Sequence, residues 1–414
     1  MIKYNKDLFK GILTINSYGC SGSGLMLSLL DGHPNCIGFQ DTLLAGYQDW
    51  WNKLKNKNGS NVLADFLDLY EVMFNPSYKH PTRSIHGNVL GEFSNFIEDK
   101  KNGVTEISVP KEPFIQCLNE IVDLNKDETA SDFFKKIHIA LGAALGKDIS
   151  SNTIIVHGSS NMHPHRAEFI KDEFKNVWNM LMVRDPVISH YAQIKRWIED
   201  PIVSGFHDPN NHIVDTLKYM QSFYFSIEGW KNCTRAVRLE DVHNNFDETM
   251  NQIINWLNIP WSDNLKKSTF LDINWNFSNN KIHSKPINPK IISKSRYKYL
   301  FTDSDYHLLS MSVWRLYKKW NYIIPNRWLI INILTAILSL FKRLKVEKDY
   351  KVNLIKIIEA RLTLLMMLFN INKISKKSII IKIFGRNFLN KILKLTNRKI
   401  DRLNSSSSII ELLK

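Results

Sequence analysis

Short runs of β-branched and apolar residues alternate with longer helical patterns between residues 10 and 322. The runs that predict strands are Ile12–Asn16, Thr153–Val156, Val177–Val183 and Thr234–Leu239, and each is followed by a turn or by residues that can start a helix. Such alternation is typical of βαβ units, in which helices join parallel strands and cover the sheet. The pattern therefore predicts an α/β fold, a three-layer α/β/α sandwich with a mostly parallel sheet.

Two segments carry the apolar spacing of amphipathic helices. One is Phe246–Leu257, which ends at Asn258-Ile259-Pro260, and the other is Ser304–Tyr317. Between Asp41 and Ser150 the pattern is mixed and rich in aromatic and loop residues. We interpret that region as an insertion that shapes a substrate cleft.

Composition excludes several classes of protein. The 414 residues are 44% hydrophobic and 23% charged, as in ordinary globular proteins and unlike collagen-like, mucin-like or wholly disordered chains. The four cysteines form no CxxC pair, which argues against a disulfide framework and against a thiolate metal site. This cysteine usage favours a reducing compartment, and we expect the protein in the cytoplasm.

Most of the positive charge belongs to the C-terminal part of the chain. Residues 323–414 contain 19 Lys and Arg against 5 Asp and Glu, so they carry +14 of the formal charge of +15. Apolar patches at Trp328–Phe341, Leu362–Ile371 and Ile379–Phe384 are set among these lysines, and each is shorter than the roughly 18 residues of a membrane-spanning helix. We expect residues 323–414 to form a basic amphipathic helical extension.

The extension allows three interpretations. Basic amphipathic helices bind anionic membranes, which predicts peripheral contact with the inner face of the membrane. A small helical domain with a solvated basic face is the alternative. Nucleic-acid binding is disfavoured because aromatic residues are sparse among the charges and no recognition motif is present. The body, residues 1–322, is nearly neutral and has to be interpreted from its motifs.

The segment Ile12–Pro34 reads as a strand, a turn rich in Gly and Ser, and an apolar helix. Such a turn lets backbone N–H groups converge on an anion at the positive end of the helix. Gly19 and Gly24 have the spacing of a Walker A loop, but Leu25 and Met26 stand where an NTPase needs Lys and Ser or Thr. Nucleotide triphosphate hydrolysis is therefore disfavoured, a tight turn without a ligand is the alternative, and the glycine order of a Rossmann dinucleotide site is not met.

The same segment resembles the phosphosulfate-binding loop of sulfotransferases that use 3′-phosphoadenosine 5′-phosphosulfate (PAPS). The helix ends in Leu29-Leu30-Asp31-Gly32-His33-Pro34, as helices of that family do. Cys20 departs from the family, which has a cation at that position. The resemblance implies a P-loop-like fold and a donor site formed by Ser21, Gly22, Ser23, Gly24 and Leu25.

A second resemblance lies at Arg184-Asp185-Pro186, which follows the predicted strand Val177–Val183. In the family, this arginine and a serine on the next helix bind the 3′-phosphate of the donor, which implies that role for Arg184. Ser189 is the candidate serine, although it lies five residues after Arg184, and the family's usual eighth position is Ala192. Taken alone, Arg-Asp-Pro after a strand is more often a structural ion pair and a helix start.

Two further stretches resemble the same family and extend the match over residues 10–322. Val237-Arg238-Leu239-Glu240-Asp241 resembles the family's Val-Arg-Tyr-Glu-Asp-Leu strand and helix. Lys281–Tyr322 resembles the family's C-terminal segment, whose basic loop closes over the nucleotide. Lys281, Lys285 and Lys290 are therefore candidate phosphate contacts, with Lys285 the preferred one. The default alternative for each is a solvated surface lysine.

The reaction needs a general base that accepts the proton of the acceptor group. His157 follows the predicted strand Thr153–Val156, at the edge of the sheet where ligands bind in open α/β folds, and its intrinsic pKa suits proton transfer. His163, His86 and Glu92 are the competing candidates. A metal site at His163 and His165 is disfavoured because no carboxylate or thiol completes it.

The resemblance implies a PAPS-dependent sulfotransferase, with residues 1–322 as its catalytic domain. The enzyme would transfer a sulfuryl group in line, without a metal, to a hydroxyl or amine of a carbohydrate or other small acceptor. A non-catalytic nucleotide- or membrane-binding scaffold on a degenerate P-loop fold is one alternative, and a nucleoside or small-molecule kinase is another. We expect acceptor specificity to reside in residues 41–150 and 200–230.

Overall fold

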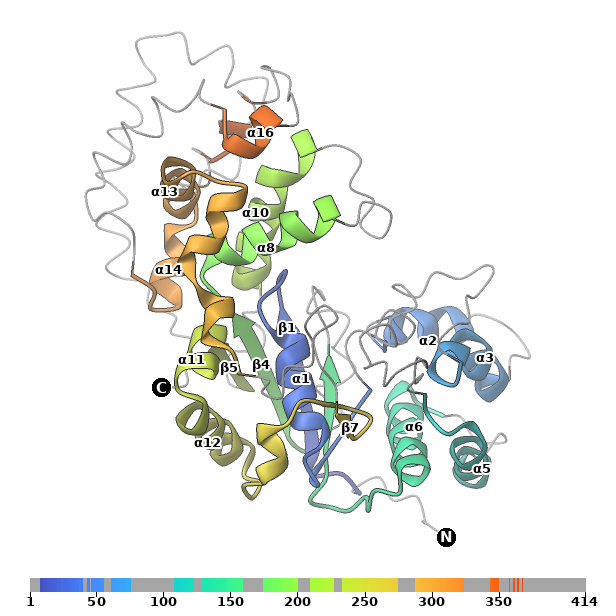
Figure 1. The fold of residues 1–414 in the computed structure, drawn as a ribbon. Helices are drawn as coiled ribbons and strands as arrows, with labels where there is room; N and C mark the ends of the chain where they lie inside the picture. Colours follow the sequence, from blue (N-terminus) through green and yellow to red (C-terminus); the bar gives the residue numbers. More distant parts are fainter. Residues whose placement is uncertain are drawn as a thin grey trace, which may run out of the picture. The chain divides into compact units, whose positions relative to one another are not determined.

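The computed structural model describes residues 8–39, 43–44, 46–55, 61–75, 108–122, 128–158, 174–199, 209–226, 233–274, 287–323 and 343–349, with residues 357, 360, 361, 363, 364 and 367. Its contacts divide the chain into two compact units, which are described separately (Figure 1). Unit 1 comprises residues 1–184, 226–292 and 412–414, and unit 2 comprises residues 185–225 and 293–411.

Unit 1 is built on a five-stranded parallel sheet with the strand order β2-β3-β1-β4-β5. The strands are β1 (Gly11–Ser17), β2 (Cys36–Ile37), β3 (Ile154–Gly158), β4 (Val177–Val183) and β5 (Thr234–Arg238). This sheet confirms the α/β class predicted from the sequence, and four of the strands lie where the apolar runs predicted them. Because β1 pairs with both β3 and β4, the loop after β1 is flanked by the ends of those two strands.

One face of the sheet packs against α1 (Ser23–Asp31) and α12 (Phe246–Leu257) to form the main hydrophobic core (Figure 1). Alternate residues of each strand point into this core because successive side chains of a strand face opposite sides. The buried core residues from the strands include Leu13, Ile15, Val156, Met180, Met182 and Val237, and those from the helices include Met26, Leu30, Met250, Ile253 and Leu257.

The opposite face of the sheet carries a row of buried polar side chains. Strand register aligns His157 with Thr14, Thr14 with Asn179, and Asn179 with Thr234. The Thr14 hydroxyl donates to Asn179 Oδ1 at 3.0 Å, and Asn179 Nδ2 donates to Thr234 Oγ1 at 2.9 Å. Hydrogen bonds therefore join β1, β4 and β5 through side chains, as buried polar groups require.

Between Asp41 and Ser150, every regular element that the structure describes is a helix or a 3-10 turn. It contains α2 (Tyr47–Lys55), α3 (Val62–Leu69), the 3-10 turn η1 (Glu71–Met73), α5 (Lys111–Ile121) and α6 (Ala130–Leu145). Aromatic side chains from these helices pack edge to face in a buried cluster, with Trp50 and Phe66 5.7 Å apart and Phe66 and Phe133 5.4 Å apart. The mixed pattern of this region therefore reflects an aromatic core, and its role in shaping a substrate cleft stays a prediction.

Short elements complete unit 1 after β5. They are α11 (Leu239–Asn244), η4 (Asp263–Lys266), β6 (Thr269–Phe270), β7 (Ile273–Asn274) and η5 (Pro289–Ile292). β6 and β7 form an antiparallel hairpin, and the Lys147 ammonium contacts the carboxylate of Asp272 in its turn at 2.9 Å.

Unit 2 is helical in its described part. It contains α8 (Pro186–Glu199), most of α10 (Pro209–Ser226), η6 (Lys294–Tyr299), α13 (Asp303–Ser312), α14 (Trp314–Lys319) and α16 (Lys345–Asp349). The helix predicted over Ser304–Tyr317 is two helices, α13 and α14, which meet at Val313. Thr302 and Asp305 form a capping box at the start of α13.

The described residues of the C-terminal extension pack within unit 2. Leu344, Val346, Ile357, Leu364 and Met367 are buried. The Arg361 guanidinium binds both carboxylate oxygens of Glu347, with Nη1 3.0 Å from Oε1. The sequence predicted a domain boundary between residues 322 and 323, with residues 1–322 as a separate catalytic domain. That boundary stays a prediction. The apolar patches Trp328–Phe341 and Ile379–Phe384 lie outside the described residues, and within those residues no helix has the length and apolar character to cross a membrane.

Candidate anion-binding site at the glycine loop

The loop between β1 and α1 brings the N-terminus of α1 to the carboxyl edge of the sheet. Gly22 is the N-cap of α1 with φ 95°, and the Met26 N–H donates back to its carbonyl at 3.1 Å. Gly22 has no side chain to cap the helix, and the first-turn N–H groups of Ser23, Gly24 and Leu25 have no carbonyl partner inside it. Such a helix end favours a bound anion.

Gly22 is required by its backbone conformation and by its surroundings. Its positive φ lies in the left-handed region that side chains disfavour. A Cβ atom at this position would lie 2.5 Å from Cδ1 of Leu239, the first residue of α11. The loop therefore packs directly against the end of β5 and the start of α11.

Serine hydroxyls hold the loop in shape. The Ser17 hydroxyl donates to Ser23 Oγ at 2.9 Å, and the Ser21 hydroxyl donates to the Tyr18 carbonyl at 2.8 Å. All three serines are buried. Ser23 accepts in its bond and keeps its own hydrogen for another acceptor, whereas the hydrogen of Ser21 is directed at Tyr18. The donor-binding role of both serines stays a prediction.

Leu25 and Met26 lie against the main hydrophobic core. Met26 is fully buried, and Leu25 is partly buried against the same cluster. In a nucleoside triphosphatase, the corresponding side chains would be a lysine and a hydroxyl that reach the phosphates and the magnesium ion. Here both positions serve packing, in keeping with the interpretation that this loop does not support triphosphate hydrolysis.

Arg184 contacts the loop from the end of β4. Its Nη1 donates to the carbonyl of Cys20 at 3.2 Å, and the residue is only 7% exposed. The sequence placed Cys20 where the resembled family has a cation and gave Arg184 a separate role at the 3′-phosphate. The structure brings the two together, so a permanent cation lies at the backbone of the glycine loop.

Asp185 has a structural role within unit 2. Its Oδ1 accepts from the N–H groups of Val187 and Ile188, each at 3.1 Å, and so caps α8. The hydroxyl of Tyr317 donates to Oδ1, and that of Tyr306 to Oδ2, each at 2.8 Å. Burial, aided by the Asp185 charge, raises the pKa of both tyrosines, which keeps them protonated donors. The helix start that Arg-Asp-Pro suggested is therefore built by Asp185.

The remaining predicted contacts are only partly described. Ser189 is buried on α8, where its N–H donates to the Asp185 carbonyl at 2.8 Å, and Lys290 is exposed on η5. The following candidates lie outside the described residues: Lys281, Lys285, His86, Glu92, His163 and His165. In the part of the chain that is described, no three or more His, Cys, Asp or Glu side chains are grouped to hold a metal ion.

His157 lies one residue before the end of β3 and is 4% exposed. Its ring meets the ring of Phe134 from α6 edge to face, with centroids 5.5 Å apart. Burial lowers its pKa to about 4. Nearby on α6, His138 donates from Nδ1 to the Phe134 carbonyl at 2.7 Å, and burial lowers the pKa of His138 to about 3. His157 is therefore neutral at pH 7, and its role as the base stays a prediction.

Sequence reasoning missed His243, a buried histidine on α11. Its Nδ1 accepts from the N–H of Asn288 at 3.1 Å. Burial, and then the nearby charge of Arg184, lower its pKa to about 4. No motif marks this residue, and its one sequence signal is that it follows Leu239 by one helical turn.

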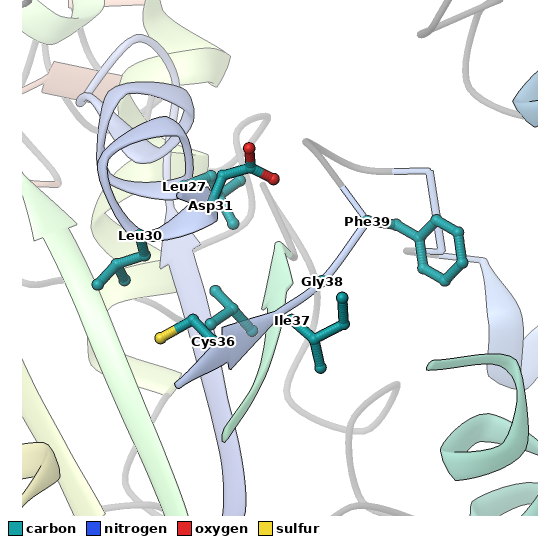
Figure 2. Close-up of a pocket in the computed structure, with 8 residues that line it drawn as sticks. Leu27, Leu30, Asp31, Cys36, Ile37, Gly38 and Phe39 are labelled. Atoms are coloured by element: carbon teal, nitrogen blue, oxygen red, sulfur yellow. The ribbon is translucent and has the colours of Figure 1, made fainter. Parts of the chain in front are cut away.

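A pocket at the far end of α1 is too small for a nucleotide. Figure 2 shows it between the last turn of α1 and the segment after β2, with lining residues that include Leu30, Asp31, Cys36 and Phe39. It has room for about one water molecule. Burial raises the pKa of the Cys36 thiol to about 12, so this cysteine is not a reactive nucleophile.

Of three comparisons with known proteins, the search of solved structures found similar chains. No protein-family model matches the sequence, and a search of curated proteins finds no match. The chain is similar to the sulfotransferase domain from the Synechococcus PCC 7002 olefin synthase (14% identity, TM-score 0.45, 78% of this chain and 99% of that one). It is also similar to the sulfotransferase domain from the curacin biosynthetic pathway (14% identity, TM-score 0.44, 76% of this chain and 99% of that one). A third similar structure is sulfotransferase STF9 from Mycobacterium avium (10% identity, TM-score 0.33, 62% of this chain and 66% of that one). The titles of all three structures name a sulfotransferase.

Proposed function

We propose that this protein is a sulfotransferase that moves the sulfuryl group of PAPS to a hydroxyl or amine of a carbohydrate or other small acceptor. The observation that carries the proposal is the glycine loop, where the N-terminus of α1 has no side-chain cap and Arg184 contacts the Cys20 carbonyl at 3.2 Å. Backbone N–H groups and a guanidinium are the donors that phosphate and sulfate oxygens accept from, so the residues present fit the donor.

The glycine loop and Arg184 would bind different charged groups of the donor. The N–H groups of Ser23, Gly24 and Leu25 would bind the phosphosulfate, because they have no carbonyl partner within the helix. Arg184 would bind the 3′-phosphate through its planar fork of N–H groups. Its contact with the Cys20 carbonyl holds it close enough to the loop to offset charge there as well.

In the proposed reaction, the acceptor oxygen or nitrogen forms a bond to sulfur while the bond from sulfur to the donor's bridging oxygen breaks. The electron pair of the broken bond stays on that oxygen, and adenosine 3′,5′-bisphosphate leaves. His157 would take the proton of the acceptor. Its pKa of about 4 leaves the imidazole neutral at pH 7, which is the form with a free lone pair.

The proposal is tested by following labelled sulfur from PAPS to a panel of carbohydrates that present hydroxyl and amine groups. We expect labelled product in the presence of EDTA, because no step of the proposed reaction uses a metal. Transfer of phosphate from ATP with Mg²⁺, together with no transfer from PAPS, would instead establish the kinase alternative.

The role of His157 is tested by His157→Ala. We expect turnover to fall by about 10²–10⁴, the usual contribution of a general base, while the affinity for adenosine 3′,5′-bisphosphate stays unchanged. His307→Ala is the matched control, because His307 is exposed on α13. If His157→Ala turns over at the wild-type rate, the base is another residue, and His163→Ala is the next variant to measure.

We further propose that the basic extension holds this cytoplasmic enzyme at an anionic membrane surface. Basic residues near such a surface contribute about 1 kcal/mol each, and salt screens the attraction. Because Leu344, Ile357 and Met367 are buried in unit 2, the test uses the full chain. We expect it to sediment with anionic vesicles at low salt and to remain in solution with neutral vesicles or at high salt. Equal sedimentation with both kinds of vesicle, or with neither, would contradict the proposal.

A further inference from the structure

Ser17 ends β1 on the face of the sheet that packs against α1. Leu13, Ile15 and Ser17 are alternate residues of this strand, so their side chains point to the same side. Leu13 and Ile15 belong to the main hydrophobic core, and Ser17 is 0% exposed. A hydroxyl in this position needs a hydrogen-bond partner, because burying one without a partner costs free energy.

The partner of Ser17 is Ser23, the first residue of α1. The two Oγ atoms lie 2.9 Å apart. Among the residues that the structure describes, neither hydroxyl has another hydrogen-bond partner. Two hydroxyls carry two hydrogens, and the bond between them uses only one. One hydrogen of the pair is therefore left for an acceptor from outside the described chain.

Burial decides which serine keeps the remaining hydrogen. If Ser23 donated, the remaining hydrogen would belong to Ser17, which is 0% exposed and out of reach of water or a ligand. If Ser17 donates, the remaining hydrogen belongs to Ser23, which is 9% exposed and lies next to Gly22, the N-cap of α1. The second arrangement costs less, because a buried donor without an acceptor is unfavourable. The Ser23 hydroxyl thus adds a donor to the N–H groups of the first turn, which lack carbonyl partners within the helix.

We propose that Ser17 is a positioning residue, whose hydroxyl holds Ser23 Oγ so that the Ser23 hydrogen points to the phosphosulfate bound at the start of α1. This inference rests on the proposed function, since the ligand is the 5′ group of PAPS. Ser23 touches the ligand, and Ser17 acts only through Ser23. A hydroxyl that already accepts a hydrogen bond is a stronger donor, and one held in place loses less rotational freedom when the ligand binds.

A double-mutant cycle separates positioning from packing. Ser23→Ala removes the ligand contact, and Ser17→Ala removes only the group that orients it. By calorimetry with adenosine 3′,5′-bisphosphate, whose 5′-phosphate occupies the start of α1, we expect Ser23→Ala to bind about tenfold more weakly or worse and Ser17→Ala about threefold to tenfold more weakly. In a Ser23→Ala background, Ser17→Ala should cause no further loss, because a residue that acts through a partner has no effect once the partner is gone.

Ser28→Ala is the matched control, because Ser28 is a fully buried serine of the same helix whose hydroxyl donates to the Leu25 carbonyl at 2.7 Å. It should bind the bisphosphate like the wild type. Adenosine 3′-monophosphate is the ligand control, because it lacks the 5′-phosphate, and its affinity should be the same in every variant. If Ser17→Ala does not fold, Ser17→Cys takes its place in the cycle, since it keeps the size of the side chain with a weaker donor, and we expect a loss of about twofold to fivefold that is again absent in Ser23→Ala.

The outcomes distinguish this inference from the function on which it rests. If the wild type binds the bisphosphate and the Ser17 variant binds it equally well, the role of Ser17 is overturned and the proposed function stands. The same holds if the Ser17 substitution costs as much in Ser23→Ala as in the wild type, or if it weakens adenosine 3′-monophosphate equally, because Ser17 would then act through packing. If the wild type fails to bind the bisphosphate, the proposed function is overturned and the role of Ser17 falls with it.

Discussion

Two strand-to-helix junctions of this protein differ in whether a side chain caps the N-terminus of the helix. β1 runs through a glycine turn into α1, and the N-cap of α1 is Gly22, which has no side chain to offer. β4 runs through Arg184 and Asp185 into α8, and the Asp185 carboxylate accepts from two N–H groups at the start of that helix. The N-terminus of α1 has no side-chain cap, and we call this the open junction. The N-terminus of α8 is capped by the Asp185 carboxylate, and we call this the closed junction.

The difference explains why a motif of three residues contains two unrelated roles. Asp185 neutralises the positive end of α8 and is held by two tyrosine hydroxyls, so a phosphate would compete with a carboxylate there. Arg184, one residue earlier, donates instead to the glycine loop. We therefore expect a negatively charged ligand to bind at the start of α1 and not at the start of α8, and the predictions below test each half of this comparison.

The largest effect is expected from removing the carboxylate that caps α8 at the junction after β4. Asp185→Ala would leave four donors around α8 without their acceptor, two of them backbone N–H groups and two of them buried tyrosine hydroxyls. We expect the free energy of unfolding to fall by about 3–5 kcal/mol. Each of the two backbone N–H groups costs about 1–3 kcal/mol when left unsatisfied, whereas the tyrosine hydroxyls lie close to each other and to Ser310. Urea denaturation measures it, and Asp185→Asn, which keeps one acceptor oxygen, should lose less. A loss below about 1 kcal/mol in Asp185→Ala would contradict the capping role.

The next effect concerns the open junction and compares three glycines. Gly22 combines a positive φ with a close contact, Gly146 has a positive φ with open space around it, and Gly46 has neither. We expect Gly22→Ala to cost about 2–4 kcal/mol from overpacking and backbone strain, Gly146→Ala about 1 kcal/mol from strain alone, and Gly46→Ala almost nothing. Thermal or urea unfolding gives the three values, and bisphosphate affinity should fall only in Gly22→Ala. Equal costs at Gly22 and Gly146 would show that Leu239 does not confine the loop.

A further effect is a loss of stability in acid. Burial lowers the pKa of His138 and His190 to about 3 and that of His157 to about 4. The unfolded chain binds protons near pH 6.5 while the folded chain does not, so stability is complete above that pH and falls as the pH drops toward 4. Each histidine contributes at most about 1.4 kcal/mol per pH unit in that window.

His190→Leu isolates one of these histidines. Both ring nitrogens of His190 are buried with no hydrogen-bond partner in the described chain, and the ring stacks on Phe301. We expect a shallower fall in unfolding free energy between pH 6.5 and 4 in His190→Leu than in the wild type or in His307→Leu, the exposed control. An unchanged slope in His190→Leu would show that this histidine is not held neutral.

The features that the sequence predicted are local ones. Strand boundaries, the glycine turn and the helix Phe246–Leu257 follow from patterns within a few neighbouring residues, where periodicity and backbone preference decide the outcome. The position of Arg184 after a buried strand could be predicted for the same reason. Its hydrogen bond to Cys20 could not, because it depends on which strands are neighbours in the sheet.

The features that the sequence did not predict depend on contacts between distant segments. Tyr306 and Tyr317 reach Asp185 from more than one hundred residues later in the chain. Asn179 is a poor strand former that is accommodated by hydrogen bonds to Thr14 and Thr234 on its two neighbouring strands. His243 acquires its fixed tautomer only through Asn288. No local pattern encodes these partners.

Calorimetry with adenosine 3′,5′-bisphosphate tests the central claim, that the open junction with Arg184 is the donor site, most directly. We expect the wild type to bind the bisphosphate more tightly than ATP with Mg²⁺. Arg184→Ala should lose about 2–3 kcal/mol of binding free energy, the scale of a charged hydrogen bond. Arg196→Ala, at an exposed arginine on α8, should bind like the wild type. Equal affinity of a folded Arg184→Ala variant for the bisphosphate, or tighter binding of ATP with Mg²⁺, would contradict the claim.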